Sequence, residues 1–147
     1  RKKELPTMSK IDRIFVDTSA FVALFNERDE MHSKAVRLFE EIKNKRIRIV
    51  VTDYILGESI TTAMARAGHR IAVTVGEFIL NSHVVDLIWL DKTIKLKAWE
   101  FFKKYSDKQY SFTDCTSFVV MREMKVNHFF AFDEHFAKAG FVDFASK

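Results

Sequence analysis

The stretch RIFVDTSAFVALF, residues 13–25, decides the fold class, because in it a short apolar run gives way to a helical pattern. Residues 14–16 are typical of a buried strand, and Asp17 stands where the following helix begins. An aspartate at that position can cap the free N–H groups of the helix, and it can equally be the first ligand of a metal site beside the strand end. With the acids found along the rest of the chain, we expect Asp17 to take both roles, as the cap of this helix and as the first ligand of a metal site.

The same alternation continues along the whole chain. Short apolar runs, partly β-branched or aromatic, lie at residues 14–16, 47–51, 84–90 and 129–132. Apolar residues recur at helical spacing between them and predict helices at residues 30–45, 53–67, 70–81 and 92–105, with a buried central helix at 111–122. Strands separated by helices indicate an α/β fold with a mostly parallel central sheet, whose ligand crevice lies beyond the carboxyl ends of the strands.

The length of 147 residues, 48% of them hydrophobic, suits one domain with its own core. We expect residues 1–10 to be a tail outside the fold, either disordered or an addition ahead of a native start at Met8, and residues 11–147 to form a single domain. No apolar run is long enough for a membrane span, and the first residues lack the apolar core of a secretory signal. A cytoplasmic location is expected, and the single cysteine, Cys115, excludes a cysteine-rich zinc site.

The net charge of +4 is weak support for a nucleic-acid partner, because four basic residues and one acid lie in the first ten positions. From residue 11 onward, 20 basic residues nearly balance 19 acidic ones. The local clusters KNKRIR (residues 43–48) and Lys103 with Lys104 are better candidates for contact with RNA, although solvated surface is the simpler interpretation of both.

Four acids are candidates for one shared site at the crevice: Asp17, Glu58, Asp114 and Asp133. Each has an ordinary explanation alone, since Asp17 and Asp133 can cap helices and Asp114 is the fourth residue of the capping box SFTD. If the fold brings them together, each pair at ~5 Å repels by roughly 3 kcal/mol at an effective dielectric constant of about 20. A bound divalent cation relieves that repulsion, and carboxylates without thiols favour Mg²⁺ or Mn²⁺. The implied chemistry is metal-assisted hydrolysis of a phosphodiester bond.

The motifs that carry these acids resemble those of the PIN domain family, and within it the VapC-like branch of toxin ribonucleases. They are VDTSAF (16–21), GES (57–59), SFTDC (111–115) and FDEHF (132–136), and the resemblance covers about residues 13–145. It implies an α/β/α sandwich, Mg²⁺- or Mn²⁺-dependent endoribonuclease activity on RNA, inhibition by a small antitoxin protein, and a homodimer. It also implies that the four acids are the catalytic and metal-binding residues and that Thr113 supplies a hydroxyl nearby.

On this interpretation Asp17, Asp114 and Asp133 hold the metal, directly or through water. Glu58 is either a further ligand or the group that orients the attacking water. The supporting residues are expected to be Thr18, Thr113 and Asp107. Three other residues are not expected to bind the metal. Asp53 and Asp91 are interpreted as ordinary caps after strands, and His135 as a residue that packs or caps near the site.

The sequence therefore predicts an endoribonuclease, the toxin of a toxin–antitoxin pair. A second hypothesis from another class is a catalytically silent module of the same fold that binds RNA or assembles with partners, and the four intact acids argue against it. The aromatic-rich runs VVDLIWL (84–90) and AWEFF (98–102) are expected in the core. If exposed, they would form a dimer face or an antitoxin groove.

Overall fold

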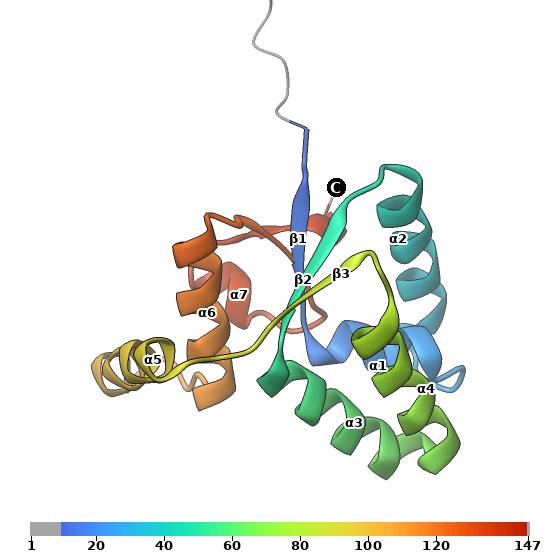
Figure 1. Ribbon diagram of the computed structural model, residues 1–147, viewed down its shortest axis with the longest axis horizontal. Helices are drawn as coiled ribbons and strands as arrows, with labels where there is room; N and C mark the ends of the chain where they lie inside the picture. The colour runs from blue at the N-terminus through green and yellow to red at the C-terminus, as the bar shows by residue number, and fades with distance from the viewer. Residues whose placement is uncertain (1–9, 147) are drawn as a thin grey trace, which may run out of the picture.

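A five-stranded sheet organises the computed structural model, which describes residues 10–146 (Figure 1). All four strand pairs are parallel, and the strand order is β3-β2-β1-β4-β5. The strands are β1 (Arg13–Val16), β2 (Arg48–Thr52), β3 (Val85–Ile88), β4 (His128–Phe130) and β5 (Val142–Asp143). The expected parallel sheet is confirmed, with the short edge strand β5 as an addition. Nearly all of the expected tail, residues 1–10, lies outside the described residues.

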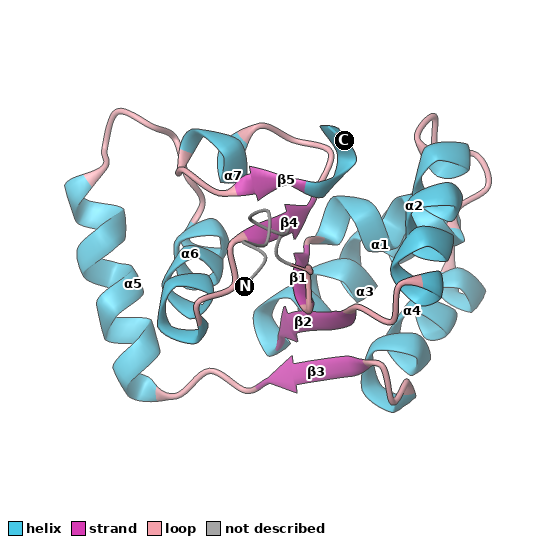
Figure 2. Ribbon diagram, turned by 90° about the horizontal axis from the view of Figure 1, so that it is seen from above, coloured by secondary structure: helices cyan, strands magenta, loops and turns pink. Residues whose placement is uncertain are grey.

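Helices cover both faces of the sheet, which confirms the predicted α/β/α sandwich. They are α1 (Thr18–Phe25), α2 (His32–Asn44), α3 (Asp53–Ala67), α4 (His69–Asn81), α5 (Lys92–Lys104), α6 (Phe112–Met124) and the single turn α7 (His135–Lys138), followed by the 3₁₀ turn η1 (Phe144–Ser146). The group α1 to α4 lies on one face and the group α5 to α7 on the other (Figures 1 and 2). Two-faced cover explains why the strands are continuous apolar runs rather than alternating ones.

The centre of the core is β1, where Ile14, Phe15 and Val16 are completely buried. Phe15 contacts Phe136 from the α7 side, with ring centroids 5.8 Å apart. Helix α6 is buried on all sides from Asp114 to Met121, because it lies between the sheet and α5, and this confirms the predicted buried central helix. Among residues 10–146 no helix is both long enough and apolar enough to cross a bilayer.

The strand order reverses beside the carboxyl end of β1. From β1 the chain proceeds outward to β2 and β3, then crosses the sheet to β4 on the other side of β1. Such a reversal of strand order is where α/β sheets bind ligands. Asp17 lies at this point, and its backbone N–H donates to the Phe130 carbonyl of β4 at 3.0 Å.

The expectation that the two aromatic-rich runs lie in the core is wrong for three of their residues. Trp89, Trp99 and Phe102 expose 65%, 47% and 39% of their surface. Helix α5 packs on α6 along one side only, and Ala98 is the single fully buried residue of α5, so the side chains on its other face point outward. The sequence shows that these residues are apolar. The exposure of Trp99 and Phe102 depends on which side of α5 packs against α6.

Candidate active site

Asp17 is the most buried of the four candidate acids, with 6% of its surface exposed. It occupies the position before α1 in an extended conformation, but its carboxylate makes no capping hydrogen bond to that helix. The expectation that its side chain caps α1 is therefore wrong. Its nearest hydrogen-bond donor is the Ser19 hydroxyl, 3.4 Å from Oδ2, and the Ser19 oxygen itself accepts the N–H of Phe132. The carboxylate is thus held at the strand end with lone pairs still available.

The pKa of Asp17 responds to the charges of the other three candidate acids. This pKa is raised from an ordinary 3.8 to about 8. Burial is the largest cause, followed by the negative charges of Asp133 and Asp114 and, more weakly, of Glu58. The neighbouring N–H of Thr18 acts in the opposite direction. Three acids from three other segments are therefore close enough to Asp17 for their charges to disfavour its ionisation. These charge effects agree with the prediction that the four side chains lie near one another.

Asp114 is oriented from two directions. Ser111 and Asp114 form the predicted capping box at the start of α6: the Asp114 N–H donates to Ser111 Oγ at 2.9 Å, and the Ser111 N–H donates to Asp114 Oδ2 at 3.0 Å. His135 Nδ1 lies 2.8 Å from the same Oδ2. The backbone N–H of His135 donates to Asp133 Oδ1 at 3.0 Å, so this residue joins two of the acids.

Glu58 reaches the site from the second turn of α3. Its Oε1 accepts the hydroxyl of Thr18 at 2.9 Å, and the Ser59 hydroxyl in turn donates to Thr18 Oγ1 at 3.4 Å. Thr18 therefore fixes one carboxylate oxygen of Glu58 and leaves the other free. The sequence indicated Thr18, but it did not single out Ser19 or Ser59, although both lie inside the motifs VDTSAF and GES.

The known proteins most informative for this arrangement share its sequence as well as its fold. The profile of the PIN domain matches residues 14–142. The chain belongs to the PIN domain family. Over 130 residues it is 38% identical to the 23S rRNA-specific endonuclease VapC20 of Mycobacterium tuberculosis, which covers 88% of this chain and 96% of that protein. A VapC ribonuclease of Archaeoglobus fulgidus is 29% identical over 124 residues, covering 83% of this chain and 78% of that protein.

A solved structure agrees with both matches. The crystal structure of Mycobacterium tuberculosis VapC20, described as a Sarcin-Ricin loop cleaving toxin, superimposes on this PIN domain with a TM-score of 0.81. The match covers 88% of this chain and 96% of that one at 38% identity. The predicted resemblance to PIN domains and to VapC ribonucleases is confirmed.

The remaining candidates of this PIN domain lie at different distances from its acids. Thr113 is half-buried in the first turn of α6, next to Asp114, whereas Asp107 is exposed in the α5–α6 loop and is not among the charges that affect Asp17. Asp91 caps α5 through the Ile94 N–H, and Asp53 accepts the N–H of Leu90. The interpretation as a helix cap is confirmed for Asp91 and is wrong for Asp53, because Thr52 caps α3 by accepting the N–H of Ile55.

The donor set of this PIN domain fits a hard divalent cation. The acids offer carboxylate oxygens without thiols, and a cation would relieve the repulsion that raises the pKa of Asp17. Within residues 10–146, no three Asp, Glu, His or Cys side chains are arranged to hold an ion by themselves. Mg²⁺ usually retains several waters, so the fit is to an ion held partly through water or after small side-chain rotations.

Proposed function

We propose that this PIN domain is an endoribonuclease dependent on Mg²⁺ or Mn²⁺ and the toxin of a toxin–antitoxin pair. One observation carries the proposal: three further carboxylates raise the pKa of Asp17 at the point where the strand order reverses. A site of four acids is costly to stability and suits an ion that binds a phosphodiester. The ribonuclease names of relatives with up to 38% identity support the same reaction.

The proposed role of each residue follows from its contacts. Asp17, Asp114 and Asp133 would hold the metal, which when bound lowers the pKa of water and offsets phosphate charge. His135 keeps Asp114 and Asp133 in place through its ring and its backbone N–H. The free oxygen of Glu58 adds a ligand or orients the attacking water, while Thr18 holds its other oxygen. Thr113 and the exposed loop residue Asp107 complete the proposed set.

The RNA to test first is the sarcin–ricin loop of 23S rRNA, because the relative at 38% identity is named for cleaving it. The experiment is cleavage of that end-labelled RNA, and of an unrelated hairpin, with Mg²⁺, with Mn²⁺ and with EDTA. The test variant is Asp17→Asn. The matched control is Asp91→Asn, which loses the same charge at a helix cap where asparagine works as well as aspartate.

Cleavage that requires the metal, persists in Asp91→Asn and disappears in Asp17→Asn would support the proposal. Equal cleavage by wild type and Asp17→Asn would refute the assignment of the site. Metal binding without cleavage of any RNA would favour the catalytically silent module, which is the second hypothesis for this fold.

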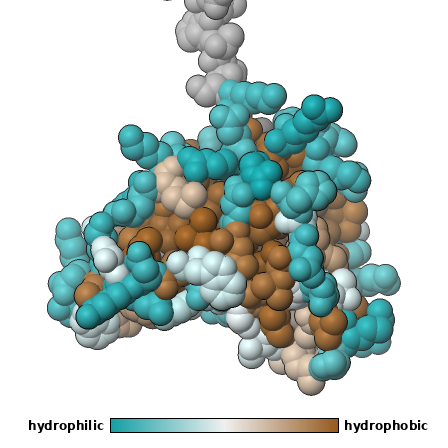
Figure 3. Space-filling view, viewed as in Figure 1, coloured by the Kyte–Doolittle hydropathy of each residue, from teal (hydrophilic) through white to brown (hydrophobic). Residues whose placement is uncertain are grey.

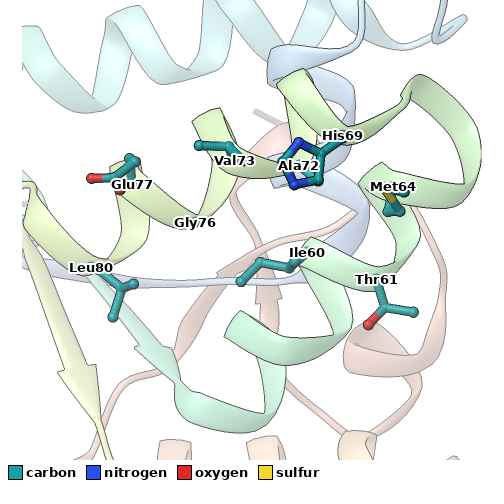
Figure 4. A pocket seen from close by; sticks show the side chains of 9 residues that line it. All are labelled: Ile60, Thr61, Met64, His69, Ala72, Val73, Gly76, Glu77 and Leu80. Atoms are coloured by element: carbon teal, nitrogen blue, oxygen red, sulfur yellow. The ribbon is translucent and has the colours of Figure 1, made fainter.

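A homodimer is part of the proposal, and the outer face of α3 and α4 is the surface that suits it. Met64, Val73 and Leu80 expose 51%, 47% and 50% of their surface there. They line a pocket of about 510 Å³ between the two helices (Figure 4). Apolar residues also gather over the middle of the molecule, around β2 and β3, in the view of Figure 3. Apolar patches on soluble proteins are commonly partner sites.

A small antitoxin protein is the other partner proposed, since VapC20 is itself described as a toxin. Acting on ribosomal RNA would place the protein in the cytoplasm. Expression of the wild type should arrest growth, and expression of Asp17→Asn should not. Co-expression of a small protein encoded beside the gene should relieve the arrest.

A further inference from the structure

A ladder of aromatic rings leads away from the four acids and onto the exposed face of α5. It consists of Tyr54, Phe112, Phe102 and Trp99, which touch in that order. The ring centroids of Tyr54 and Phe112 are 6.2 Å apart, those of Phe112 and Phe102 are 6.3 Å apart, and those of Phe102 and Trp99 are 5.9 Å apart with nearly parallel planes. Three elements, α3, α5 and α6, contribute to this ladder.

The inner end of the ladder is attached to the acid-bearing helices. Tyr54 lies one turn before Glu58 on α3, so the two side chains share a face of that helix. Phe112 is the first residue of α6, in the same turn as Asp114. The outer end is open to solvent, as the exposures of Phe102 and Trp99 show. Figure 2 shows α5 and α6 side by side, with α5 on the outside of its layer.

Lysines accompany the rings. The ammonium of Lys95 lies 5.6 Å from the centre of Tyr54, and that of Lys103 lies 5.8 Å from the centre of Trp99. Within residues 10–146 Lys95 has no carboxylate partner, while Lys103 pairs with Glu100 at 3.0 Å where both side chains are at least half exposed. Exposed pairs of this kind are weak and exchange readily. The sequence of α5 contains five lysines and one acid, so its surface is positively charged next to an acidic site.

We propose that this ladder binds unpaired nucleotides of the RNA substrate beside the scissile bond, with bases stacked on Trp99 and Phe102 and phosphates near Lys95 and Lys103. The inference rests on the proposed ribonuclease function and adds to it the surface that holds the RNA next to the cleavage point. Rings that alternate with cations are how proteins hold single strands, because every base has a face that can stack. The four acids repel phosphate, and the lysines of α5 supply the compensating attraction.

The chain offers a direct reporter, because Trp89 and Trp99 are its only tryptophans. In Trp89→Phe, the emission comes from Trp99 on the ladder, and in Trp99→Phe it comes from Trp89, which is exposed but contributes no ring to the ladder. Each change is made in the Asp17→Asn background, so that RNA binds without being cleaved. The probes are a short single-stranded oligoribonucleotide and the same strand annealed to its complement.

We expect the single strand to quench Trp99 strongly and Trp89 little, and the duplex to quench neither. In anisotropy titrations, Trp99→Ala should weaken binding of the single strand by ~5- to 100-fold, the range for loss of one stacked base, whereas Trp89→Ala should leave it unchanged. Lys95→Ala should lower the salt dependence of binding by about 0.7 in the log–log slope, as expected for one phosphate contact to a single strand.

The outcomes separate this inference from the function on which it rests. If wild type cleaves RNA but Trp99 is not quenched and Trp99→Ala binds normally, the ladder proposal is overturned and the ribonuclease function is supported. If Trp99 is quenched but wild type cleaves nothing, the ladder binds RNA and the proposed ribonuclease function is refuted. If Trp99→Ala converts a dimer to a monomer without changing RNA affinity per protomer, the surface belongs to a second copy of the chain and the inference is wrong.

Discussion

At the scale of single residues, the carboxyl group of Asp17 lowers the stability of the fold when it is ionised. Its carboxyl has a pKa of about 8 in the fold and 3.8 ordinarily, so the folded state binds a proton more tightly than the unfolded state. In metal-free protein this group therefore makes stability fall as pH rises from about 4 to about 8, by at most about 1.4 kcal/mol per pH unit. Thermal unfolding in EDTA should show a melting temperature that declines across this window, and Mg²⁺ should raise it more at pH 8 than at pH 5.

Asp17→Asn tests the cause of that decline. Removing the charge should flatten the dependence of the melting temperature on pH and raise the melting temperature at pH 8, although the variant is expected to be inactive. Asp91→Asn should retain the slope of the wild type. A slope that persists in Asp17→Asn would mean that another group is responsible.

Cys115 is predicted to be inert in the folded protein. Its side chain is completely buried in α6, and burial, followed by the charge of Asp114, raises the pKa of the thiol to about 11. Because the thiolate is the reactive form, an aromatic disulfide reagent should label Cys115 only after a denaturant is added. Rapid labelling of native protein would contradict both the burial and the packing of α6.

At the scale of elements, the capping box of α6 couples helix stability to the site. Ser111→Ala should cost about 1 kcal/mol of unfolding free energy and should also reduce kcat, because Ser111 and Asp114 hold each other. The matched control is Asp91→Ala, which removes the cap of α5 at a similar cost but away from the acids. Ser111→Thr keeps the hydroxyl and should restore both quantities. Equal kcat in Ser111→Ala and Asp91→Ala would show that the box only stabilises the helix.

The elements also show where local sequence was sufficient. The predicted helix at residues 53–67 has the bounds of α3, and the SFTD pattern correctly predicts the capping box of α6. The single turn α7 and the two-residue β5 were not predicted, because elements this short show too little periodicity. The position of α7 depends on the burial of its own Phe136 in the core, and the position of β5 depends on its pairing with β4.

At the scale of the whole molecule, the exposed face of α3 and α4 predicts self-association. Wild type should sediment as a dimer, and Leu80→Asp should sediment as a monomer, because a charge would enter the apolar face. Thr74→Asp, on an exposed part of the same helix, is the control and should remain dimeric. A monomeric wild type at every concentration would exclude this interface.

The sequence by itself determined the alternation of strands and helices, the burial of α6, and three of the four candidate acids at strand and helix ends. These follow from local rules of periodicity and capping, which act over a few neighbouring residues. The tertiary structure alone decided that the charges of residues 58, 114 and 133 act on Asp17, that His135 joins Asp114 and Asp133, and that Trp99 faces solvent. Each of these depends on strand order and helix packing, which bring together side chains up to about a hundred residues apart, and no local pattern encodes such distances.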